Sequence, residues 1–148
     1  IHKPLGIAIL ILAIVRLAVR LRHPPPPLPA DLPALQKLAA LASHWLLYFL
    51  MLAMPLIGWA MLSAGGYPVM LSDSLRLPPI FPANPVAFAV LRHLHGWFAM
   101  LLLLTFIAHM AAALYHGLIR RDAVLSSMLR GERKAEMIEP VIEPATLP

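Results

Sequence analysis

The sequence contains no cysteine among its 148 residues. This absence excludes disulfide bonds, cysteine-ligated iron–sulfur clusters and thiolate zinc sites, and it leaves histidine as the main metal ligand. Charge is also scarce: Asp, Glu, Lys and Arg make up 13% of the chain, whereas a soluble domain carries about 25%. Hydrophobic residues make up 60%, and the mean hydropathy is +0.77. These proportions place the chain among membrane proteins.

Three apolar segments are long enough to cross a bilayer, whose hydrocarbon core of ~30 Å needs about 20 residues of helix. They cover about residues 4–21, 38–62 and 94–119. We therefore predict an all-α fold, a transmembrane helical bundle formed by residues 1–130. The tail, residues 131–148, mixes charges with prolines and is predicted to be disordered.

The basic residues predict how these segments are oriented. The formal net charge is +5 and the pI is near 10.3, but the basic residues lie beside apolar runs and form no polar face for nucleic acid. Most of them flank residues 22–37 or follow the third segment, whereas residues 65–92 contain only Arg76 and Arg92. The positive-inside rule therefore predicts that residues 22–37 and the C-terminus are cytoplasmic and that residues 65–92 lie outside.

Three histidines recur along the third segment, His95, His109 and His116, at intervals of fourteen and seven residues. Because a helix advances ~100° per residue, fourteen residues return to within about 40° of the starting direction and rise ~21 Å. His95 and His109 therefore share a face at two depths, where polar side chains need a partner inside the bundle. The first segment repeats this spacing, so we expect His2 at the level of His95 and Arg16 near the level of His109.

Two neutral imidazoles that face each other at one depth are what axial ligation of a haem iron requires, and His2 and His95 meet this description. At the other level, Arg16 is placed either to pair with a haem propionate or to extend to the lipid headgroups. His44, at the start of the second segment, either contacts a cofactor or quinone or caps the helix. Histidines near the membrane interface are interpreted as hydrogen-bonded polar residues: His23, His93 and His116.

These residues carry a family resemblance. LRHLHGWFAMLLLLTFIAHMAAALYHGLIRRD (91–122) resembles the last transmembrane helix of the bacterial cytochrome b561 family. IHKPLGIAILILAIVRLAVRLRHPPPP (1–27) resembles that family's second helix and the linker after it, and SHWLLYFLMLAMPLIGWAML (43–62) resembles its third. The resemblance covers about residues 1–130, and it extends to the membrane b-type subunits of hydrogenases and formate dehydrogenases.

The resemblance implies a four-helix bundle in the bacterial inner membrane that holds two b haems, one near each membrane face. On the matching positions, His2 and His95 ligate the outer haem, and His109 ligates the inner haem opposite a histidine of the family's first helix. We expect that helix to be absent here, so that three of four spans are present and one bis-histidine site can be completed. His44 and His116 are less favoured as the second inner ligand.

Haem iron with two histidine ligands has no open position, so it transfers electrons. The resemblance implies electron exchange between membrane quinone and a periplasmic donor, with superoxide:ubiquinone oxidoreductase activity as one version. The alternative is an electron-transfer subunit of a larger membrane dehydrogenase or hydrogenase complex. Expected partners are thus membrane lipid, quinone, a periplasmic donor or catalytic subunit, and a second copy of the chain, but not nucleic acid.

Two further interpretations concern charge. The basic residues Lys3, Arg76 and Arg92 on the outer side either attract a small anion such as superoxide or are ordinary surface charge. A non-redox hypothesis, metal or proton transport through the histidines, is disfavoured because the three apolar segments contain no Asp or Glu.

Overall fold

The computed structural model describes residues 1–23 and 33–120. Within them lie three long helices, of which the last continues into a π-helix: α1 (His2–Arg22), α2 (Ala34–Ala64), α3 (Pro85–Leu114) and η1 (Tyr115–Arg120). All three spans are long and apolar enough to cross a membrane, which confirms the predicted transmembrane helical bundle. The proline-rich segment 24–32 and the predicted disordered tail 131–148 lie outside the described residues.

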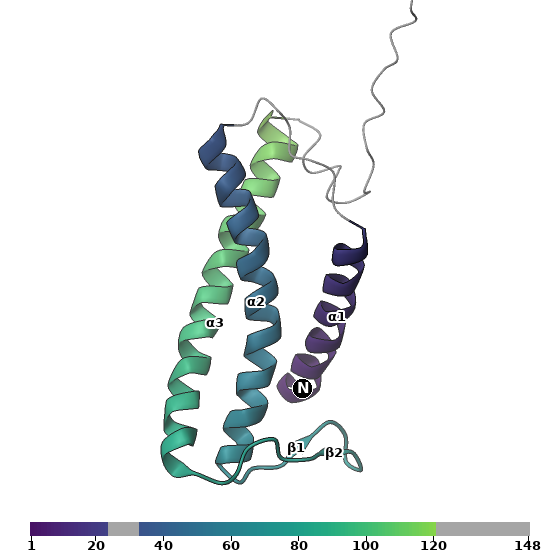
Figure 1. Ribbon diagram of the computed structural model, residues 1–148, viewed down its shortest axis with the longest axis vertical. Coiled ribbons are helices and arrows are strands. Elements are labelled where there is room, and N and C mark those ends of the chain that lie inside the picture. The colour runs from purple at the N-terminus through teal and green to yellow at the C-terminus, as the bar shows by residue number, and fades with distance from the viewer. Residues whose placement is uncertain (24–32, 121–148) are drawn as a thin grey trace, which may run out of the picture.

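Helix α2 is the central element and lies between α1 and α3 (Figure 1). It packs against both neighbours, whereas α1 and α3 do not pack against each other in the described part of the chain. Leu50, in the middle of α2, is the largest fully buried side chain described. Most large apolar side chains of α1 and α3 are exposed, as expected where helices meet lipid.

Helix α3 begins at Pro85, well before residue 94, where the predicted third span starts. The Asn84 side chain caps the helix by accepting a hydrogen bond from the Ala87 backbone N–H at 3.0 Å. Pro85 suits the first turn because its missing N–H would have no partner there. At about 1.5 Å per residue, α3 with η1 exceeds the ~30 Å of hydrocarbon, so the helix extends beyond the membrane core.

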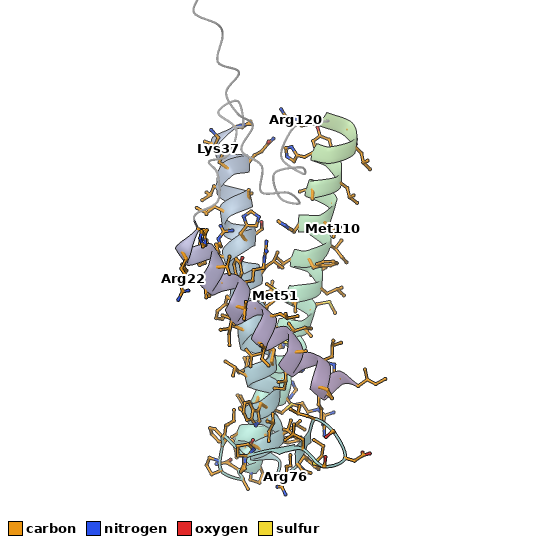
Figure 2. All side chains as sticks on the ribbon, turned by 90° about the vertical axis from the view of Figure 1, so that its right-hand side faces the viewer. Arg22, Lys37, Met51, Arg76, Met110 and Arg120 are labelled. Atoms are coloured by element: carbon orange, nitrogen blue, oxygen red, sulfur yellow. The ribbon has the colours of Figure 1, made fainter. Side chains whose placement is uncertain are left out.

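The connection between α2 and α3 forms an antiparallel hairpin of two short strands, β1 (Val69–Met70) and β2 (Arg76–Leu77). The hairpin lies across the end of the bundle at which α1 begins (Figure 1). The indole N–H of Trp59 on α2 donates to the Pro78 carbonyl at 3.0 Å and ties this connection to the bundle. We call this end the hairpin end. Lys37 and Arg120 lie at the opposite end, and Arg22 lies part-way along the bundle, where α1 ends (Figure 2).

Candidate functional site

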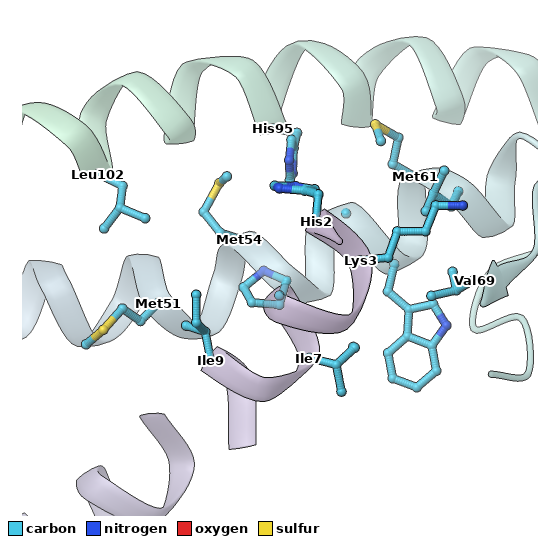
Figure 3. Close-up of a pocket in the computed structure, with 15 residues that line it drawn as sticks. His2, Lys3, Ile7, Ile9, Met51, Met54, Met61, Val69, His95 and Leu102 are labelled. Carbon is cyan, nitrogen blue, oxygen red and sulfur yellow. The ribbon is translucent and has the colours of Figure 1, made fainter. Parts of the chain in front are cut away.

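The hairpin end brings together two histidines from helices that do not pack against each other. His2, in the first turn of α1, lies beside His95 of α3, and their ring centroids are 6.2 Å apart with an interplanar angle of 87°. Figure 3 shows the two imidazoles next to each other above α2. The structure therefore places His2 and His95 at one level, as their positions in the sequence predict.

These imidazoles line a cavity of 280 Å³ whose other walls are mostly apolar (Figure 3). Helix α2 contributes Met51, Met54 and Pro55, and the buried Val69 of the hairpin lies at one side. Lys3 brings a positive charge to the lining, and its Nζ donates to the Pro68 carbonyl at 3.2 Å. The cavity is therefore a mostly apolar space whose lining includes two imidazoles and one cation.

His95 is held against the backbone of α2 at Gly58. A Cβ added at Gly58 would lie 3.1 Å from Cε1 and 3.5 Å from Nδ1 of His95, so glycine is the residue that allows this close approach. The Nδ1 atom is buried, and the backbone of Met54 on α2 lies within hydrogen-bond reach of this imidazole. Gly58 was not predicted as a site residue, although an isolated glycine in an apolar helix is a signal for close packing.

A second pair of histidines lies between α2 and α3, farther from the hairpin end. The ring centroids of His44 and His109 are 5.0 Å apart, with an interplanar angle of 66°. Ser43 contacts one member of this pair: its Oγ donates to the Ala40 carbonyl at 2.9 Å and is 3.3 Å from Nδ1 of His109. His44 is therefore a direct neighbour of His109. Ser43 was not predicted as a site residue.

Two arginines of α1 accompany this second pair. Arg16 and Arg20 are both close enough to His44 to act on it electrostatically. The guanidinium carbon of Arg20 also lies 5.7 Å from the ring centre of Trp45 and 5.5 Å from that of Tyr48, within the range of a cation–π interaction. None of the three long helices or η1 contains an Asp or Glu, so this polar region is entirely basic.

The other histidines lie apart from the cavity. His23 and His93 are exposed, and His116 lies in η1 with its ring 5.7 Å from that of Tyr115. The π-helix that contains His116 was not predicted, because a change from the α-helical hydrogen-bond pattern leaves no mark in an apolar sequence.

Comparison with known proteins gives the family. Residues 1–131 match the family described as prokaryotic cytochrome b561. The chain belongs to this family. It is 34% identical to the probable superoxide oxidase CybB of Yersinia pestis over 134 residues. These matched residues make up 90% of this chain and 75% of that protein. It is also similar to two proteins of Escherichia coli K12. Cytochrome b561 homolog 2 is 31% identical over 129 residues (86% of this chain and 68% of that protein), and homolog 1 is 30% identical over 128 residues (86% and 72%).

As a cytochrome b561, the protein is a multi-pass membrane cytochrome of electron transport, and haem b is the cofactor that the family implies. The geometry at the hairpin end fits this cofactor. A metal–imidazole bond is about 2 Å long and the ring centre lies about 1 Å behind the nitrogen, so imidazoles on opposite sides of one metal have centroids roughly 6 Å apart. The 6.2 Å between His2 and His95 meets this requirement.

His44 and His109 do not have the spacing of two ligands of one haem iron. The 5.0 Å between the centroids of His44 and His109 is shorter than two ligands of one iron require. His109 fits as a single axial ligand because it is half-buried and its Nδ1 is engaged by Ser43. His44 packs against His109 as a neighbour and does not fit as the ligand opposite it in this arrangement.

Proposed function

We propose that this cytochrome b561 carries electrons through the membrane between a donor at the hairpin end and membrane quinone. In this proposal His2 and His95 would hold an outer haem b, and His109 would be one of the residues that hold an inner haem b. The observation that supports it most strongly is the 6.2 Å spacing of the His2 and His95 rings in an apolar cavity.

The residues around the outer site have definite tasks in this proposal. When bound, haem b supplies reversible one-electron transfer at its iron. His2 and His95 would hold its iron through their imidazole nitrogens and would leave no room for another ligand. Gly58 fixes the position of His95, and Val69 with the hairpin helps to exclude water from the cavity. The rise of ~21 Å between His95 and His109 sets the two haem levels.

We further propose that the hairpin end faces the periplasm and that superoxide is the donor. The orientation follows from the Lys and Arg distribution, and the donor from the similarity to the probable superoxide oxidase of Yersinia pestis. Lys3 supports an anionic donor because its charge lies beside the outer site, and a local positive potential raises the encounter rate of small anions. Each superoxide gives up one electron and leaves as molecular oxygen, and two electrons with two protons reduce one quinone to quinol.

The test uses the purified protein in detergent with a superoxide-generating system and a short-chain ubiquinone. We expect a reducible b-type haem spectrum, haem reduction by superoxide, and quinol formation that superoxide dismutase suppresses. A purified protein without a reducible b-type spectrum would refute the proposal. The alternative is an electron-transfer subunit of a larger complex. It would be supported if superoxide does not reduce the haem of the loaded protein and the protein co-purifies with a dehydrogenase or hydrogenase subunit.

A further inference from the structure

The hydroxyl of Ser43 lies between two groups that can accept its proton. Its Oγ is 2.9 Å from the Ala40 carbonyl of the same helix and 3.3 Å from Nδ1 of His109 on α3. A serine hydroxyl has one proton to donate, whereas a carbonyl oxygen can only accept. The shorter contact is the one to Ala40. The Ser43 hydroxyl therefore donates to the Ala40 carbonyl and presents a lone pair to His109.

This arrangement determines the tautomer of His109. A neutral imidazole carries its proton on either Nδ1 or Nε2. An unprotonated Nδ1 would set its lone pair against the lone pair of Ser43 Oγ, whereas a protonated Nδ1 donates to it. The proton of His109 therefore lies on Nδ1, and Nε2 keeps the lone pair that a metal ligand needs.

We infer that Ser43 is the positioning residue of His109, which fixes its tautomer and ring orientation so that Nε2 is directed to the inner haem iron. This inference rests on the proposed function, in which His109 is an axial ligand. Metal-ligating histidines usually donate their second N–H to a carboxylate, a backbone carbonyl or water, and this bond tunes the ligand. The helices contain no carboxylate, and the Ser43 hydroxyl, itself bonded to the Ala40 carbonyl, takes that role.

The ring of His44 adds a second restraint. It packs against His109 at 5.0 Å and 66°, so His109 is confined by a hydrogen bond at Nδ1 and by a neighbouring ring. His95 provides a contrast, because the backbone of Met54 on α2, and not a side-chain hydroxyl, is the hydrogen-bond partner of its imidazole. The two histidines that recur on one face of α3 thus have different supporting groups, although their own sequence contexts are equally apolar.

The inference is tested by redox titration of the purified holoprotein. In Ser43→Ala the Nδ1–H of His109 loses its acceptor, which makes the imidazole a weaker electron donor to the iron. We expect the midpoint potential of the inner haem to shift to more positive values while that of the outer haem is unchanged. Ser43→Thr keeps a hydroxyl at this position and should restore the parental potential.

Thr105 offers a matched control on α3. Its Oγ1 donates to the Leu101 carbonyl of its own helix at 2.7 Å, and it precedes His109 by one turn. Thr105→Val removes a hydroxyl of the same kind without removing the acceptor at Nδ1. Both haem potentials should therefore stay at the parental values, and a shift as large as that of Ser43→Ala would overturn the specific role of Ser43.

His109→Ala, measured in parallel, separates this inference from the proposed function. If His109→Ala keeps both haem signals, His109 is not a ligand and the proposed ligand set fails. If it loses the inner haem while Ser43→Ala leaves the inner potential unchanged, the role of Ser43 is overturned and the ligand set stands. If Ser43→Ala itself loses the inner haem, Ser43→Thr decides. An inner haem retained at the parental potential in Ser43→Thr supports the inference, and loss of the inner haem in Ser43→Thr overturns the inference.

Discussion

The imidazole of His95 on α3 lies so close to the backbone of Gly58 on α2 that a side chain at position 58 would crowd it. A Cβ at position 58 would lie 3.1 Å from Cε1 of His95, whereas carbon atoms pack best at about 3.5–4.0 Å. Glycine inside a helix costs roughly 0.5–1 kcal/mol relative to alanine, so helix stability alone would favour a different residue here. Close approach of the His95 imidazole supplies a reason for glycine at this position.

The first prediction is that Gly58→Ala weakens the outer haem site. The new methyl group forces the His95 ring away from α2, and such overpacking typically costs about 1–3 kcal/mol. We expect less haem per protein and a shifted potential for the outer haem, with an unchanged inner haem, in a haem assay and redox titration. Gly96→Ala is the control, because Gly96 directly follows His95 and a Cβ at position 96 meets nothing within 4 Å. If Gly58→Ala keeps the parental content and potential of the outer haem, the contact between Gly58 and His95 does not shape the outer haem site.

The second prediction concerns the packing of α1 on α2 through Arg20. Arg20→Gln removes the charge that lies over the Trp45 and Tyr48 rings, an interaction worth about 0.5–2 kcal/mol. We expect a lower midpoint of thermal unfolding in detergent. Arg22→Gln, at an exposed position in the last turn of α1, should change the midpoint much less. Equal effects of the two substitutions would show that the rings do not stabilise the helix pair.

The third prediction concerns the covering of the outer site by the hairpin. Trp59→Phe keeps an aromatic ring but removes the indole N–H that donates to the Pro78 carbonyl, a bond worth about 0.5–1.5 kcal/mol. Local opening should become about two- to tenfold more frequent, seen as faster amide hydrogen exchange in residues 66–84. Trp97→Phe, at a side chain that is 74% exposed on α3, should leave that exchange unchanged. Unchanged exchange in Trp59→Phe as well would mean that this bond does not hold the hairpin.

The features that the sequence predicts are those that depend on one helix at a time. Apolar runs of sufficient length predict each membrane span. The fourteen-residue interval places His95 and His109 on one face at two depths, because helix geometry fixes both direction and rise within one element. The start of α3 at Pro85 was not predicted, although Asn84 followed by Pro85 is a typical N-terminal signal.

The features that the sequence did not predict depend on how helices fit together. Whether His44 faces His109, or Gly58 faces His95, depends on the tilt and the axial offset between α2 and α3. The apolar residues of these helices do not allow the tilt or the offset to be predicted from the sequence. The same holds for Arg20, whose contacts with aromatic rings of α2 are set by the packing of α1. The hairpin was missed for a different reason: its strands have two residues each, too few to show an alternating pattern.

We propose above that His2 and His95 hold one haem between them. Haem content of His2→Ala and His95→Ala tests it most directly, with His93→Ala as the control, because His93 is exposed only two residues from His95. We expect each of the first two substitutions to remove the same b haem from the spectrum and His93→Ala to retain it. Parental haem content and an unchanged spectrum in His2→Ala would contradict it.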